Sequence, residues 1–268
     1  MTKLSHDRYC SEVVRQTELL RSALRGADLT AAVPTCPEWT LAHLLLHLGQ
    51  AHRYAEGLVR TRTTEFEVPA GVGGPPVPGP GDPALDAGVA AFDAWLAEGA
   101  ETVAKTLREA GPDSPAWTFG ATQTASFWAR RMTHETVMHR ADAEGTTGVE
   151  FAVAQDVAAD CVDEWLEIIG SPMAMEYNPK YKELLGPGRT LHLHATDTPP
   201  ELDAEWFVDF SGERVEWRRA HAKAAVALRG PLTDVLSVFY RRRPADTDRV
   251  EIVGDRELLD FWLERTSF

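Results

Sequence analysis

Helical periodicity of apolar residues dominates the first two thirds of the chain. Valine and leucine recur three or four positions apart between about Leu4 and Arg25, which predicts an amphipathic helix that Gly26 ends. The same spacing predicts four further helices. They are expected at 41–62 after a capping Thr40, from Asp82-Pro83 to about Gly111, at 124–144 and at 153–169. Helices joined in this way favour an up-down bundle over residues 1–170, with four helices as its frame.

The longest connection between these helices is "VPAGVGGPPVPGPGDP", residues 68–83. Its proline and glycine content is incompatible with a helix or a central strand. We therefore expect a long surface loop between the second and third helices.

Strict alternation of apolar and polar residues replaces the helical period after a linker at 171–188. The segment "TLHLHAT" alternates along its whole length, and "AEWFVDF" and "RVEWRR" flank Ser211-Gly212 as a hairpin. Further strands are expected in "AKAAVALRG" and "RVEIVGD", and helices at Leu232–Tyr240 and Arg256–Glu264. The fold class is thus an α domain at 1–170 followed by a smaller α+β domain at 189–268.

Charge and composition limit the classes of molecule that the protein is expected to bind. A net charge of −14 argues against nucleic acid and against anionic membrane surfaces, since both attract basic proteins. The first residues lack the apolar core of a signal peptide, and the sequence has no apolar run long enough to span a membrane. We expect a cytoplasmic monomer or weak dimer. The three scattered cysteines are expected to be reduced, without metal or redox spacing.

The segment "RRMTHETVMHRADAE" carries the first candidate chemistry. His134-Glu135 resembles the start of a zinc-protease motif, but the next histidine, His139, comes one residue too late. At about 100° per residue, Glu135 and His139 share a helix face and His134 lies on another. This excludes the protease motif. Glu135 and His139 are then either two ligands of a divalent ion or an ordinary polar pair.

A third ligand is expected from the helix at 41–62, which holds three histidines. His47 lies within "LLLHLG", on or beside the apolar stripe, whereas His43 is a turn nearer the start and His52 is nearer the basic, exposed end. Taken alone, His47 is better interpreted as a core histidine that a backbone or hydroxyl group satisfies by hydrogen bonding. Together with Glu135 and His139 it favours a metal site with an open coordination position.

Five segments of the sequence resemble those of a known family. "PEWTLAHLLLHLG", followed by "HETVMHRAD", resembles the N-terminal domain of the mycothiol-dependent maleylpyruvate isomerase family, which belongs to the DinB-like helical bundles. "LHLHATDTP", "VALRGPLTDVLSVFYRR" and "VEIVGDRELLDFWL" are similar to the C-terminal domain of that family, which is related to sterol-carrier-like folds. The resemblance implies that the metal ligands are His47, Glu135 and His139.

The resemblance also implies a function. A bound zinc or similar divalent ion would lower the pKa of a low-molecular-weight thiol such as mycothiol, for S-transfer to a small electrophilic substrate or for its cis-trans isomerisation. Asp142 is expected to orient His139 or to pair with Arg140 or a neighbouring strand. Two alternatives stay open: a hydrolase or hydratase that uses metal-bound water, and a non-catalytic small-molecule binding protein with a structural metal site.

The sequence of the second domain offers fewer candidate functional residues. Arg241 and Arg242, with Arg243, are interpreted as cations at a helix end, or as weak candidates for binding carboxylates of the substrate or thiol. His192 and His194 alternate on one strand face, and such a pair can bind metal. Because no third ligand lies nearby in the sequence, we interpret them as surface residues.

Overall fold

The computed structural model describes residues 3–79 and 85–266, apart from the side chains of 85–87. The chain divides into two compact units, Leu4–Phe151 and Ala152–Phe268, and Lys3 is grouped with the second unit. The fold class is confirmed: a helical N-terminal unit is followed by an α+β unit.

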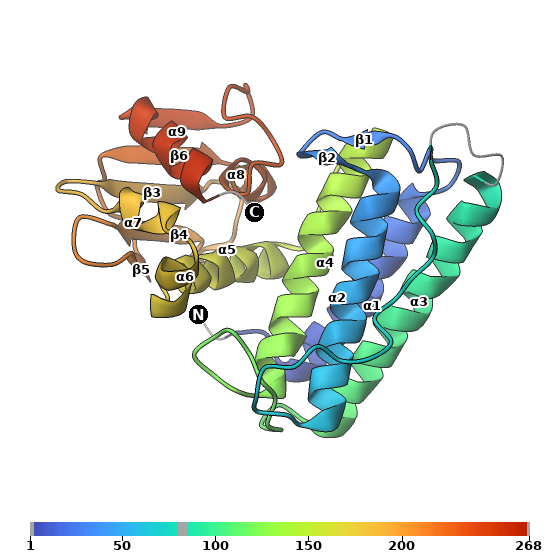
Figure 1. The fold of residues 1–268 in the computed structure, drawn as a ribbon. Coiled ribbons are helices and arrows are strands. Elements are labelled where there is room, and N and C mark those ends of the chain that lie inside the picture. The colour runs from blue at the N-terminus through green and yellow to red at the C-terminus, as the bar shows by residue number, and fades with distance from the viewer. Residues whose placement is uncertain (1–2, 80–84, 267–268) are drawn as a thin grey trace. The chain divides into compact units, whose positions relative to one another are not determined.

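Long helices that run alongside one another form the first unit (Figure 1). Their apolar stripes meet in a core of leucine, valine, alanine and aromatic side chains. These helices agree with the predicted segments to within a few residues. Their bounds are α1 His6–Ala23, α2 Leu41–Thr61, α3 Leu85–Ala110 and α4 Ala125–Thr147. The predicted start of the third helix at Asp82-Pro83 lies outside the described residues.

The ends of α2 follow from its capping residues. The hydroxyl of Thr40 accepts a hydrogen bond from the backbone N–H of His43, and the backbone N–H of Thr40 donates to Nδ1 of His43 at 3.2 Å. At the other end, Arg62 takes a left-handed conformation with φ of 54°. The predicted cap and the predicted length of this helix are both confirmed.

A short β-hairpin precedes α2, and the sequence did not predict it. Strands β1 (Ala32–Val33) and β2 (Cys36–Thr40) pair antiparallel, with Ala32 opposite Thr40. The segment is short and contains two prolines, so alternation could not reveal it. Figure 1 shows the hairpin at the end of the bundle where α2 begins.

The second unit is built on a five-stranded sheet in the order β5-β4-β3-β6-β7. Strands β3 and β6 pair in parallel, and the other neighbours pair antiparallel. All five strands fall within predicted segments, and the β4–β5 hairpin turns at Ser211-Gly212 as expected. The bounds are β3 Thr190–Ala195, β4 Glu205–Asp209, β5 Glu216–Arg219, β6 Val226–Gly230 and β7 Glu251–Gly254.

Helix α5 belongs to this second unit, whereas the sequence grouped it with the bundle over residues 1–170. Its apolar side packs on α8: the rings of Trp165 and Tyr240 lie 5.6 Å apart, and the Tyr240 hydroxyl donates to the carbonyl of Cys161 at 2.8 Å. The expected linker at 171–188 also contains two short helices. The bounds are α5 Gln155–Ile169, α6 Pro172–Tyr177, α7 Lys180–Leu184, α8 Leu232–Phe239 and α9 Arg256–Arg265.

A buried polar network ties α5 to the inner face of the sheet. The indole Nε1 of Trp206 donates to Oδ1 of Asp163 at 2.7 Å, and the Arg219 guanidinium pairs with Oδ2 at 2.8 Å. Leu191 and Leu193 line the same face and are fully buried. Alternate residues of β3 and β4 therefore lie on the opposite face, where they include His192, His194 and Glu205.

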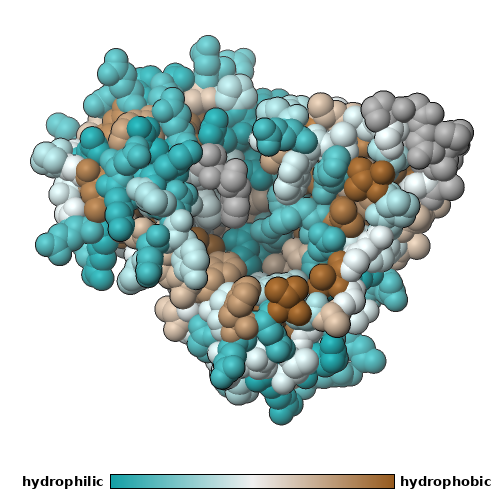
Figure 2. Space-filling view, in the orientation of Figure 1, coloured by the Kyte–Doolittle hydropathy of each residue, from teal (hydrophilic) through white to brown (hydrophobic). Residues whose placement is uncertain are grey.

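The visible surface is mostly hydrophilic (Figure 2). In the view of Figure 2 most surface side chains are hydrophilic, and the apolar ones form small separate groups. Across the part of the chain that the structure describes, no helix combines the length and apolar character that crossing a membrane requires.

Candidate metal centre

His47, Glu135 and His139 meet between α2 and α4. Nε2 of His47 lies 2.9 Å from Oε1 of Glu135, although the two residues are 88 positions apart in the chain. Nε2 of His139 lies 3.2 Å from the same oxygen, and the two imidazole rings are 4.9 Å apart. The three ligand-type atoms lie within 4.8 Å of one another. The structure thus brings together all three residues that the sequence selected.

The helical period explains the local part of this geometry. Glu135 and His139 are one turn apart on α4 and present their side chains to α2, where His47 faces them. Side-chain exposure is 41% for His47 but 14% for Glu135 and 10% for His139. The group is therefore buried on the α4 side and accessible from the His47 side.

Asp142 fixes the orientation of the His139 ring. Its Oδ2 lies 2.9 Å from Nδ1 of His139, and its Oδ1 accepts a hydrogen bond from the hydroxyl of Thr35 in the β1–β2 connection at 2.5 Å. Of the contacts expected for Asp142, the one with His139 is present, and Arg140 pairs with Glu144 at 3.0 Å. A carboxylate on Nδ1 leaves Nε2 of His139 to face Glu135.

Charges around Glu135 keep it ionised. Burial would raise the pKa of Glu135, but His139, Arg131 and His47 hold it well below its usual range. Arg131, one turn earlier on α4 and 4% exposed, donates to Oε2 of Glu135 at 3.0 Å. This contact occupies the carboxylate oxygen that points away from the histidines and leaves Oε1 to them.

His139 lies between two carboxylates, which favour a positive charge at this position. Burial lowers the pKa of His139, yet Glu135 and Asp142 outweigh it and raise the pKa to about 9. The site without a metal therefore stabilises an imidazolium. A bound cation would supply the same positive charge in place of that proton.

The donor set fits a divalent transition metal. Two imidazole nitrogens and one carboxylate oxygen are among the ligand sets that catalytic zinc takes, with a remaining position for water or substrate. The Asp142–His139 contact is the outer carboxylate that commonly supports a histidine ligand. These residues therefore fit such an ion, and His47, Glu135 and His139 are the ones that would hold it.

Trp39, in β2, covers one side of the group. Its ring lies 5.0 Å from that of His47 and 6.3 Å from that of His139. No sequence pattern predicted a role for Trp39, Thr35 or Arg131. Trp39 stands directly before the helix cap in "PEWT", but only the unpredicted hairpin reveals that it reaches the site.

The remaining histidines of α2 and α4 lie elsewhere. His134 is buried with its ring 6.1 Å from that of Tyr9, and His43 caps α2. The interpretation that His52 lies near an exposed end is wrong. It is fully buried, and Nε2 lies 2.9 Å from the hydroxyl of Thr136, because α2 packs along α4 beyond His47 and Glu135.

The arginines proposed for substrate binding lie in the turn that follows α8 in the second unit. Helix α8 ends at Phe239, so Arg241 and Arg242 come after the helix rather than within its last turn. Arg241 has φ of 59°, and Arg242 donates to the carbonyl of Tyr240 at 2.9 Å. Their role in binding a substrate or thiol stays a prediction.

Two family models together match most of the chain. The model of the mycothiol maleylpyruvate isomerase N-terminal domain matches residues 10–144, and that of the C-terminal domain of the same isomerase matches residues 156–261. The chain belongs to this family. The matched ranges contain His47, Glu135 and His139 in the first model and the whole five-stranded sheet in the second.

Solved structures give the same fold. A crystal structure of the mycothiol-dependent maleylpyruvate isomerase has a TM-score of 0.55 and 16% identity, and covers 95% of this chain and 97% of its own. A crystal structure of a histidine-to-alanine mutant of that isomerase has a TM-score of 0.56, 15% identity and the same coverage. Comparison with curated proteins found no match. This member of the isomerase family thus keeps the family fold at low sequence identity.

Proposed function

We propose that this protein is a divalent-metal-dependent enzyme that uses mycothiol or a similar low-molecular-weight thiol to transfer sulfur to, or isomerise, a small electrophilic substrate. One observation carries the proposal: His47, Glu135 and His139 converge within 4.8 Å, with His47 on the accessible side. Membership of the mycothiol maleylpyruvate isomerase family supports the choice of thiol and reaction class.

A zinc or similar ion bound by these residues would lower the pKa of a thiol at its open coordination position and so provide thiolate at neutral pH. The side chains of the chain supply the rest. Glu135 contributes negative charge while Arg131 holds its second oxygen, and Asp142 keeps the His139 ring in place. Trp39 gives an apolar wall beside His47 that limits access of water.

Two outcomes follow from attack of the thiolate on a conjugated double bond. In isomerisation a C–S bond forms, the former double bond rotates as a single bond, and elimination restores the double bond and the thiolate. In transfer, protonation of the carbon retains the C–S bond and gives an S-conjugate. Neither outcome needs a protein cysteine, and Cys10 and Cys161 are both buried.

The test is incubation of zinc-loaded protein with mycothiol and a panel of electrophiles that includes maleylpyruvate. Conjugates are detected by mass and isomers by chromatography. We expect thiol-dependent product from the wild type and its loss in His47→Ala. His43→Ala is the matched control, since His43 is an exposed histidine of the same helix that caps it rather than facing Glu135.

Three results would overturn the proposal. Product that forms equally without thiol would favour metal-bound water and a hydrolase or hydratase. Full activity in His47→Ala would remove the metal centre from the reaction. An inert protein that retains a bound apolar molecule through purification would favour a small-molecule binding protein with a structural metal site.

A further inference from the structure

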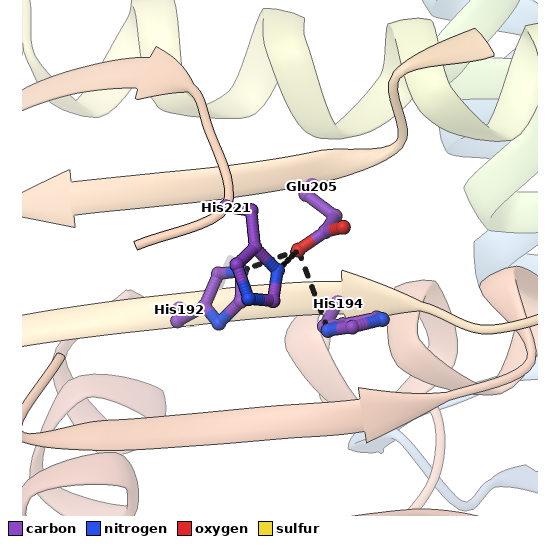
Figure 3. A group of neighbouring side chains, drawn as sticks. All are labelled: His192, His194, Glu205 and His221. Atoms are coloured by element: carbon purple, nitrogen blue, oxygen red, sulfur yellow. Dashed lines mark hydrogen bonds and ion pairs between the residues drawn. The ribbon is translucent and has the colours of Figure 1, made fainter. Parts of the chain in front are cut away.

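A second cluster of ligand-type side chains lies on the sheet of the second unit. It consists of His192 and His194 on β3, Glu205 on β4 and His221 just after β5 (Figure 3). Their ligand atoms all lie within 4.8 Å of one another. The two candidate clusters use different residues on different elements, and neither the thiol chemistry proposed above nor the family motifs assign this one.

One carboxylate oxygen is the centre of the cluster. Oε2 of Glu205 lies 2.9 Å from Nε2 of His192, 3.3 Å from Nδ1 of His194 and 2.7 Å from Nδ1 of His221. Figure 3 shows these three contacts meeting at that oxygen. A carboxylate oxygen has two lone pairs, so three imidazoles around it exceed its hydrogen-bonding capacity. A shared cation would satisfy all four groups at once.

Sheet pairing builds the cluster. His192 and His194 alternate along β3 and so lie on the same face, and Glu205 is directly opposite His194 in the antiparallel strand β4. The interpretation of both histidines as surface residues is wrong for His192, which is 6% exposed. The missing third ligand was not near in the sequence because strand pairing, not chain proximity, supplies it.

The crossover between β5 and β6 supplies the fourth residue. It must pass β4 and β3, because β5 is at one edge of the sheet and β6 lies beyond β3. Its first residue, Ala220, donates its N–H to the carbonyl of Glu205 at 3.1 Å, and its last, Ala225, donates to the hydroxyl of Thr190 at 2.8 Å. The segment therefore runs over the histidine face and places His221 above Glu205.

We propose that His192, His194, Glu205 and His221 bind a divalent transition-metal ion, with zinc as the best match, and that this ion fastens the β5–β6 crossover to the sheet. Three imidazoles and one carboxylate supply four protein ligands, which complete a tetrahedral zinc site. Such a closed site is structural, since it leaves no position for a substrate.

The ligand types decide the class of ion. Imidazole-rich sites select zinc, copper or nickel, whereas magnesium and calcium require mostly oxygen ligands. The nearest cation in register is Arg229, opposite His194 on β6, and it pairs with Glu251 at 3.0 Å. That pairing offsets the repulsion that Arg229 would exert on a bound ion.

The proposed ligands differ in exposure, and this difference predicts how strongly each substitution affects metal binding. His192 is 8% exposed at its side chain, Glu205 24% and His221 76%. The strand residues form a preformed half of the site, and His221 closes it from the crossover. Removal of His221 should therefore weaken binding without unfolding the unit, whereas removal of both β3 histidines should abolish binding.

The experiment uses the full chain without a histidine tag, stripped with a chelator and titrated with Zn²⁺ alone. Elemental analysis after desalting should find about two ions per chain in the wild type and about one in His47→Ala/His139→Ala, which lacks the first site. In that background, His192→Ala/His194→Ala should lose the remaining ion, and His221→Ala should bind it at least about 10-fold more weakly, since loss of an outer-shell partner of a ligand alone costs about 10- to 100-fold. His43→Ala should keep both ions.

A second measurement keeps the proposal testable if the His192→Ala/His194→Ala variant fails to fold. In the His47→Ala/His139→Ala background, Zn²⁺ should raise the thermal midpoint of the protein, and His221→Ala, an exposed change, should reduce that shift. The proposal is overturned if the background binds no Zn²⁺, or if binding and the thermal shift are unchanged by both His221→Ala and His192→Ala/His194→Ala. Because the His47→Ala/His139→Ala background lacks the first site, the results in that background are independent of the proposed thiol chemistry.

Discussion

Asp142 and His139 are joined across one turn of α4, with Oδ2 of the carboxylate 2.9 Å from Nδ1 of the imidazole. Asp142 is itself fully buried at its side chain and held by Thr35. The contact decides which nitrogen of His139 faces Glu135, and it is the part of the candidate site that mutagenesis can test most directly.

Asp142→Ala should weaken metal binding by roughly 10- to 100-fold, because a ligand histidine loses the carboxylate that orients it. Competition titration against a zinc chelator measures the affinity. Asp142→Asn should lose less, since its amide oxygen can still accept from Nδ1. Thr35→Val serves as the control, because it removes a different hydrogen bond to Asp142 and leaves His139 untouched. Equal affinity in Asp142→Ala and wild type would show that Asp142 does not orient a ligand.

His52 should make the fold sensitive to acid. Burial lowers the pKa of His52 to about 4, and Arg53 adds to this, whereas an unfolded chain has the ordinary value of 6.5. Between these two pKa values the unfolded state binds one more proton than the folded state. The contribution of neutral His52 to the free energy of unfolding is therefore fully present above pH 6.5 and is lost as the pH falls towards 4. The loss is on the order of 3 kcal/mol for this fully buried group.

The measurement is urea denaturation at several pH values for the wild type and His52→Gln, which cannot titrate but can still donate to Thr136. The stability of His52→Gln should decline less steeply over this interval than that of the wild type. The two proteins would show the same slope if His52 were already protonated in the native state.

The buried network around Asp163 should contribute strongly to the stability of the second unit. Asp163→Ala removes the partner of Arg219, whose side chain is 8% exposed, and also leaves Nε1 of Trp206 without its acceptor. An uncompensated buried guanidinium costs about 3 to 5 kcal/mol. Chemical denaturation followed by tryptophan fluorescence measures this loss.

A matched control lies on the same sheet. Arg214 pairs with Glu216 at 2.9 Å, but the two side chains are 66% and 65% exposed. Arg214→Ala should therefore cost less than about 1 kcal/mol. If Asp163→Ala cost no more than Arg214→Ala, the network would be incidental to stability.

The cysteines should differ in reactivity. Cys10 is fully buried, and burial, the largest influence, raises the pKa of its thiol to about 11; Cys161 is equally inaccessible. Cys36 in β2 is half-buried. Iodoacetamide at mildly alkaline pH should label Cys36 first in the native protein, and mass spectrometry of peptides locates the label. Cys36→Ser should remove the early labelling; fast modification of Cys10 would contradict its burial.

Local patterns in the sequence were sufficient to predict most of the helices and strands. Thr40 before an apolar stripe predicts the start of α2, and alternation in "TLHLHAT" predicts β3, because both signatures depend on residues that are neighbours in the chain. The pair Glu135 and His139 is equally local, since one helical turn separates them. His47 was selected from three histidines by its place beside the apolar stripe, and the family resemblance pointed to the same residue.

Tertiary packing decided the contacts between residues that are distant in the sequence. The β1–β2 hairpin brings Thr35 to Asp142 and Trp39 to His47, the packing of α2 along α4 buries His52, and α5 packs on α8 within the second unit. The same holds for Glu205 and His221, which meet His192 and His194 only through sheet order and a crossover. The sequence by itself determined where the helices and strands begin and which face of each is apolar, since these depend on residue spacing. Which faces meet was decided by burial of apolar surface across distant segments, and no local pattern records it.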